Sequence, residues 1–122
     1  SDSLIKGALE FNDQTVGGDD VYSIKALKSI RINIEFNIDM FVFRKYQSGA
    51  LGYDVRGVRL QIMKISNEID SNGEAVTTET VIGSFELTTE SETPVEKKVS
   101  ESYNISLLHN DKIIVRAMYV NG

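Results

Sequence analysis

The sequence predicts an all-β protein, folded as an antiparallel sandwich or barrel. Apolar and polar residues alternate with a period of two along most of the chain, as in strands with one buried face. Turn-forming residues separate about seven or eight such stretches. No stretch shows the apolar spacing of a long helix, and no internal repeat or linker is visible. We therefore expect an antiparallel β-sandwich that spans residues 1–122 as a single domain.

In the first half of the chain, a short strand is predicted at 7–11, followed by a turn at 15–20, where paired glycines and aspartates favour irregular backbone. A second strand is predicted at 21–28. The strongest strand signal is at 29–46, where isoleucines alternate strictly with polar residues and four apolar residues then follow in a row. A loop that contains two glycines is expected at 45–54.

In the second half, a strand is predicted at 55–65, with a β-bulge at Gly57 because the phase of the apolar residues shifts across that glycine. The polar stretch 66–78 contains an Asn-Gly pair typical of hairpin turns. A strand at 79–89 precedes a charged connection at 90–99 that holds the only proline. The last strands are expected at 102–108 and 112–120, joined by the turn "HND".

Charge and composition exclude several classes of protein. The chain of 122 residues has a formal net charge of −5, whereas a nucleic-acid binder needs a basic surface to displace counterions, and anionic lipid attracts basic segments. The absence of cysteine excludes disulfides, thiolate zinc sites and thiol catalysis. No apolar run is long enough to insert into a membrane. Because the chain opens with Ser1 rather than Met, we expect a processed chain or a segment excised from a longer protein.

Three segments resemble the C1q/TNF-like jelly roll, in the order of that family and over roughly residues 20–120: "SIRINIEFNIDMFVF", "RGVRLQIMKISNE" and "VSESYNISLLHNDKIIVRAMYV". Asn110 stands where the family usually has a turn glycine, and Asn tolerates the left-handed backbone better than most residues. The sequence departs from the family in two places. The usual Gly-x-Tyr before the central strand is replaced by "ALKSIRI", and the final strand with its Phe-Ser-Gly motif is absent.

The resemblance implies a jelly roll of about eight strands that often forms a homotrimer at the tip of a longer fibrous or structural protein. Such domains occur in virions and phage fibres, in bacterial surface filaments and in secreted proteins, and they are rarely enzymes. We therefore expect an extracellular, cell-surface or virion location.

A polar row on the central strand is the first candidate binding surface. Its residues can hydrogen-bond the hydroxyls of a sugar, bridge subunits, or form a solvated sheet face with cross-strand pairs. The carboxylates of Glu35 and Asp39 lie too far apart along one strand for the acid pair of a glycosidase. The row consists of Arg31, Asn33, Glu35, Asn37 and Asp39.

The apolar run Met40, Phe41, Val42 and Phe43 breaks the alternation and needs cover on both faces. That cover comes either from a loop or N-terminal arm of the same chain, or from a neighbouring subunit. Aromatic residues are enriched at the centre of interfaces, so Tyr119 or Tyr103 can join such a patch.

No cofactor is expected, and calcium stays open as an alternative at two loops. Asp19 and Asp20 lie together in one loop, and Asp70 and Asn72 lie in another, "DSNGE", which copies a fragment of a calcium loop but lacks its remaining acidic ligands. An Asn-Gly turn needs no metal. The single histidine, His109, is expected in a turn, because no nucleophile or set of metal ligands accompanies it.

The sequence is compatible with two functions. The first is a non-enzymatic structural, assembly or attachment module that forms homo-oligomers, with a glycan or a cell-surface receptor as a further partner. The second is a carbohydrate-binding module, with Tyr46 and Tyr53 as the aromatic residues that contact sugar, although the absence of Trp argues against it. No residues suggest catalysis.

Overall fold

The computed structural model describes residues 7–16, 19–47 and 53–121, and it confirms an all-β, antiparallel architecture. The described part of the chain contains no helix with the length and apolar character needed to cross a membrane. Seven strands of eight residues or more are joined by one strand of three residues, β4. The strands are β1 (Leu9–Val16), β2 (Asp19–Ala26), β3 (Ile30–Val42), β4 (Lys45–Gln47), β5 (Tyr53–Ile69), β6 (Ala75–Thr88), β7 (Val95–Leu107) and β8 (Lys112–Asn121).

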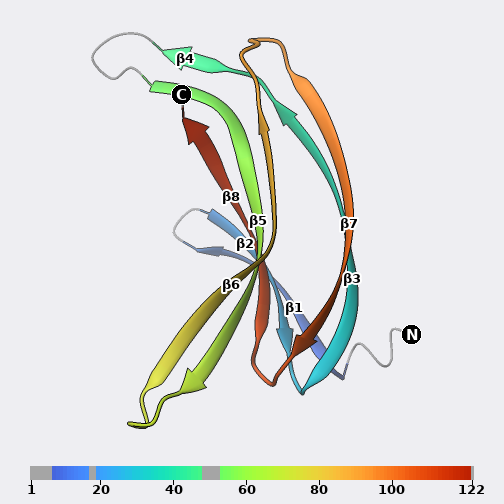
Figure 1. Ribbon diagram of the computed structural model, residues 1–122, viewed down its shortest axis with the longest axis vertical. Coiled ribbons are helices and arrows are strands. Elements are labelled where there is room, and N and C mark those ends of the chain that lie inside the picture. Colours follow the sequence, from blue (N-terminus) through green and yellow to red (C-terminus); the bar gives the residue numbers. More distant parts are fainter. Residues whose placement is uncertain (1–6, 17–18, 48–52, 122) are drawn as a thin grey trace.

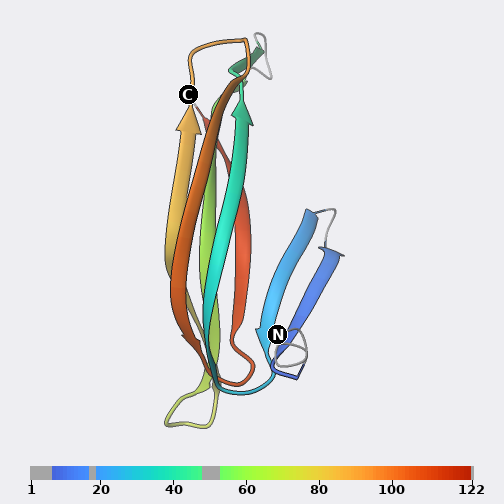
Figure 2. The same ribbon diagram turned by 90° about the vertical axis from the view of Figure 1, so that its right-hand side faces the viewer.

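The strands form two sheets of unequal size (Figures 1 and 2). The large sheet has the order β1-β2-β8-β5, and the far edge of β5 pairs with both β6 and β4. The small sheet contains only β3 and β7. The fold is therefore a sandwich of two unequal sheets. Consequently, the small sheet, which contacts β5 and β6, covers only part of the large sheet.

The core lies between the two sheets. Ile62 of β5, Leu107 of β7 and Ile113 of β8 are the largest side chains that are fully buried. Burial of one such side chain contributes roughly 1.5–3 kcal/mol. The alternation predicted for the central strand is present, because the even-numbered residues of β3 pack inward against β7, with Ile30 opposite Leu107 and Ile32 opposite Ile105.

Two irregularities bend β5 and β6. The register between β5 and β8 shifts between Val55 and Gly57, which confirms the bulge predicted at this glycine. A Cβ atom on Gly57 would lie 2.1 Å from the carbonyl oxygen of Leu87, so no other residue fits without moving the backbone. A second shift, between Ile62 and Met63, makes Ile82 of β6 the extra residue.

Several strands are longer than the sequence predicts. The polar stretch 66–78 is mostly strand, because β5 runs to Ile69 and β6 begins at Ala75. β7 begins at Val95, within the connection predicted at 90–99. Alternation is lost at these ends because both faces of the hairpin tip are exposed. In β7, Lys97 and Glu101 occupy exposed positions on the face that carries Val99.

The turn between β7 and β8 is built around Asn110 and Asp111. Asn110 has a φ angle of 74°, which confirms the left-handed turn expected there. Asp111 is only 3% exposed, and its Oδ2 accepts a hydrogen bond from the backbone N–H of Leu108 at 2.9 Å. The Lys64 ammonium lies 3.8 Å from the same carboxylate. The sequence placed Asp111 in the turn "HND" but showed neither its burial nor its role as the acceptor that closes the turn.

Candidate interaction surface

β3 leads toward β4 in the upper part of Figure 1. Residues of this region, together with residues of β5 and β8, line an apolar groove. Its volume is about 750 Å³, which falls within the range of binding pockets. β3, β5 and β8 supply its walls, which include Phe41, Val42, Phe43, Val55, Val58 and Tyr119. We call this feature the apolar groove.

The aromatic side chains of the apolar groove face solvent. Phe41 is 63% exposed, Phe43 50% and Tyr119 80%. Met40 and Val42, by contrast, are buried, with only 3% and 6% of their surface exposed. Their own chain covers them, so they offer little surface to a partner. The apolar run therefore divides by face. The described residues cover Met40 and Val42 on the inner face of β3, whereas Phe41, which continues the outer face of the strand, and Phe43 stay exposed.

Tyr119 is exposed because the small sheet covers only the first residues of β8. Tyr119 pairs in register with Val58, while Val115 pairs with Ile62, so Tyr119 and Val115 both lie on the face that carries the core. At Ile62 that face is fully buried, yet Val115 is 37% exposed. The small sheet contacts the large one chiefly through β3 on β5 and β6. The apolar face of β8 is therefore covered at Ile113 but open from Val115 to Tyr119.

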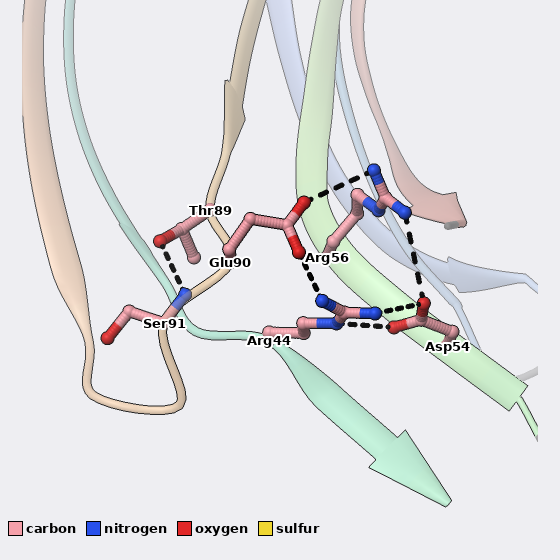
Figure 3. A network of polar contacts seen from close by, with 6 residues as sticks. All are labelled: Arg44, Asp54, Arg56, Thr89, Glu90 and Ser91. Atoms are coloured by element: carbon pink, nitrogen blue, oxygen red, sulfur yellow. Dashed lines mark hydrogen bonds and ion pairs between the residues drawn. The ribbon is translucent and has the colours of Figure 1, made fainter.

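A network of four charged residues holds the β3 wall of the apolar groove (Figure 3). The Arg44 guanidinium makes a bidentate contact with the Asp54 carboxylate: Nε donates to Oδ1 at 3.0 Å and Nη2 donates to Oδ2 at 2.8 Å. Its Nη1 pairs with Glu90. Arg56 Nη1 lies 3.3 Å from Glu90 Oε1. The backbone N–H of Arg44 also donates to the carbonyl of Ser91 at 2.7 Å. Because Arg44 directly follows Phe43, this network ties the groove wall to β5 and to the β6–β7 connection.

The network also lowers the pKa of the Asp54 carboxyl. Its hydrogen bond from Arg44 holds the pKa of the Asp54 carboxyl below the ordinary 3.8, against the opposing effect of burial. Charge attraction from both arginines acts in the same direction as that hydrogen bond. Asp54 is therefore ionised at neutral pH and stabilises the fold as an ion-pair partner.

The outer face of the small sheet carries a continuous polar surface, which we call the polar ladder. Each residue of the predicted polar row lies exposed opposite a polar residue of β7. Asn33 donates to Asn104 Oδ1 and Ser100 donates to Asn37 Oδ1, both at 2.9 Å. The facing pairs are Arg31 with Ser106, Asn33 with Asn104, Glu35 with Ser102, Asn37 with Ser100 and Asp39 with Lys98.

Glu96 lies beside the Asp39 end of the polar ladder, and its pKa is raised above the ordinary value. Burial raises the pKa of Glu96, and a hydrogen bond and charge repulsion from Asp39 raise it further. The Lys98 ammonium lies 3.6 Å from Glu96 Oε1 and partly offsets this repulsion. The amides, hydroxyls and carboxylates of the ladder can exchange hydrogen bonds with the hydroxyls of a sugar.

The candidate calcium ligands do not converge within the described residues. Asp70 Oδ1 accepts hydrogen bonds from the backbone N–H groups of Asn72 and Glu74, both at 2.9 Å, and so closes the hairpin turn. Asp19 and Asp20 open β2, and only their backbone is described. Among the described residues, no group of three or more His, Cys, Asp or Glu side chains is arranged to hold a metal ion.

The predicted aromatic sugar contacts lie at the β4–β5 hairpin. Tyr46 pairs through its backbone with Asp54, and Tyr53 pairs with Gln47. Their side chains, and the residues 48–52 between the strands, lie outside the described part of the chain. His109 lies exposed in the β7–β8 turn, next to the left-handed Asn110.

The fold and its surfaces define a β-sandwich domain with one open apolar groove and one polar ladder. No family model, curated protein or solved structure matches the chain. The resemblance to the C1q/TNF-like jelly roll therefore stays a prediction.

Proposed function

We propose that this protein is a non-enzymatic structural and attachment module that associates with further copies of itself, as in a virion, fibre or surface filament. The observation that carries the proposal is the exposure of Phe41, Phe43 and Tyr119 around the apolar groove. Monomeric proteins rarely expose large contiguous apolar patches, and such patches mark interaction sites. Aromatic residues are also enriched at the buried centres of interfaces.

Solution mass tests this function. Light scattering over a wide concentration range should show self-association of the wild-type chain, and Phe41→Ser with Phe43→Ser should weaken it. Ile69→Ser is the matched control, because Ile69 is 76% exposed at the far end of β5 from the groove. A wild-type chain that stays monomeric at the highest concentration would refute self-association.

Carbohydrate binding is the second candidate, and the polar ladder is the observation that favours it. The cross-strand bonds of Asn33 and Asn37 hold their amides at fixed positions on a solvated face. A glycan array with the wild-type chain and with Asn33→Ala plus Asn37→Ala tests it. We expect binding that the double substitution reduces. Absence of any glycan signal, or a signal unchanged in the variant, would exclude the ladder.

A further inference from the structure

Most of the outer side of β8 is left without a neighbouring strand. β8 pairs with β5 along its whole length, but it pairs with β2 only from Lys112 to Ile114. Beyond that point the β1–β2 hairpin leans away from β8 (Figure 2). Among the described residues, nothing pairs with the outer edge of β8 from Val115 to Val120.

The backbone shows which groups point to this open edge. The N–H of Ala26 donates to the carbonyl of Asp111 at 2.8 Å, so Asp111 points its carbonyl toward β2. Along a strand, alternate residues direct their N–H and C=O groups to the same side. Val115, Ala117 and Tyr119 therefore present their hydrogen-bonding groups to solvent, while the residues between them bond to β5.

The open edge also lacks the usual protection. Proteins guard exposed edges with lysine, proline, bulges or short strands. Between Val115 and Val120 there is neither lysine nor proline, and the register of β8 is continuous. The one charge, Arg116, lies 3.7 Å from Glu79 and is thus compensated. The edge of β7, in contrast, carries charged residues such as Lys97 and Lys98.

We propose that a second copy of this chain adds to the sheet here, with the two β8 strands antiparallel about a two-fold axis at Ala117. This inference rests on the proposed self-association and names its contact. Facing residues of antiparallel strands lie on the same side of the sheet. The register therefore places Val115 opposite Tyr119 of the second copy, so that the apolar faces of both β8 strands meet beside the apolar groove.

Charge argues against the register shifted by one residue toward Arg116. A two-fold axis at Arg116 would place two guanidinium groups directly opposite each other, which is unfavourable. With the axis at Ala117, Arg116 faces Met118 of the second copy instead. The strip from Val115 to Val120 carries only that compensated charge, so two chains of net charge −5 can meet there with little repulsion.

The edge also offers apolar surface to a second copy. An aromatic side chain has about 200 Å² to bury, so the exposed fraction of Tyr119 alone amounts to roughly 160 Å² in each copy. The paired backbone of β8, with Val115 and Ala117, adds to this area. Strand addition at a sheet edge is an established mode of recognition.

A charge-swap experiment tests the register. Val115→Lys and Tyr119→Glu are made separately, and the mass of each is measured by sedimentation over a range of concentrations. Each variant alone should raise the dimer dissociation constant about tenfold or more, because an apolar contact is lost. When the two variants are mixed, heterodimers should form in preference to either homodimer, because the introduced ammonium of one copy faces the introduced carboxylate of the other.

Val81→Lys is the matched control, since Val81 is a valine of β6 that is 48% exposed, and it should leave the dimer intact. Circular dichroism confirms that each variant is folded. A wild-type dimer that neither variant weakens, a mixture without preferred heterodimers, or a wild-type trimer would overturn the pairing while self-association stands. A monomeric wild type would instead refute the proposed function, and this pairing with it.

Discussion

Tyr103 of the small sheet packs directly on Gly83 of the large sheet. A Cβ atom at position 83 would lie 2.3 Å from the Tyr103 hydroxyl oxygen and 3.0 Å from the ring carbon that bears it. The same ring meets Phe36 edge-on, with centroids 6.1 Å apart. A missing side chain on β6 thus makes room for the Tyr103 ring between the two sheets.

Gly83→Ala should therefore destabilise the fold by about 1–3 kcal/mol, because the added methyl group overpacks the contact with Tyr103. Tyr103→Phe should recover part of this loss when combined with it, since the closest atom is then gone. Urea unfolding of the two single variants and the double variant measures the coupling. Gly7→Ala is the control, because nothing lies within 4 Å of a Cβ there. Purely additive effects would contradict the contact.

Alkaline pH should weaken the fold through Tyr103. Burial raises the pKa of its hydroxyl above the ordinary 10.0, and the charge of Glu101 raises it further. The folded state thus holds this proton more tightly than the unfolded state does. The stability that it contributes is fully present below about pH 10 and is lost as the pH rises through the folded value. Unfolding free energies of wild type and Tyr103→Phe, compared from about pH 8 to pH 11, should show a smaller alkaline loss in the variant.

Acidic pH should lower the stability of the fold through Asp54. Because the pKa of Asp54 is lowered in the folded state, its contribution is present above the ordinary 3.8 and is lost as the pH falls through the folded value. Asp54→Asn should reduce thermal stability at neutral pH and flatten its acid dependence. Melting temperatures from neutral to strongly acidic pH measure both effects. An equally steep acid loss in the variant would show that other carboxyl groups dominate.

Asp111→Ala should cost about 1–3 kcal/mol, because the N–H of Leu108 is left without its acceptor and the Lys64 ammonium loses a nearby charge. Chemical unfolding measures the loss. His109→Ala in the same turn is the control and should stay within about 0.5 kcal/mol, since His109 is exposed. A loss as small as that of the control would remove Asp111 from the residues that hold this turn.

How well the sequence predicts a strand depends on how many of its faces are buried. β3 was predictable because its inner face is covered from Ile30 to Val42, so that apolar and polar residues alternate. The first half of β7 was not, because Lys97 and Glu101 point to its partly open side. Likewise, the tip of the β5–β6 hairpin is exposed on both faces and carries no period that separates it from a loop.

The candidate surfaces divide in the same way. The polar row from Arg31 to Asp39 was visible in the sequence because it depends on local alternation, and the apolar run at Phe41 and Phe43 was visible as the point where that alternation stops. The four-residue network around Arg44 was not, since its members come together only when β3, β5 and the β6–β7 connection meet. The exposed edge of β8 was equally invisible, because pairing partners are set by contacts between distant segments.

The sequence by itself determined the class of the fold, the bulge at Gly57, the left-handed turn at Asn110 and the split of β3 into an apolar and a polar face. These features follow from side-chain periodicity and from the backbone preferences of single residues. Only the tertiary structure decided that the second sheet has two strands, and hence that Tyr119 and the edge of β8 stay uncovered. The physical reason is that a strand's own residues show which face it buries, but not how far the opposing sheet extends over it.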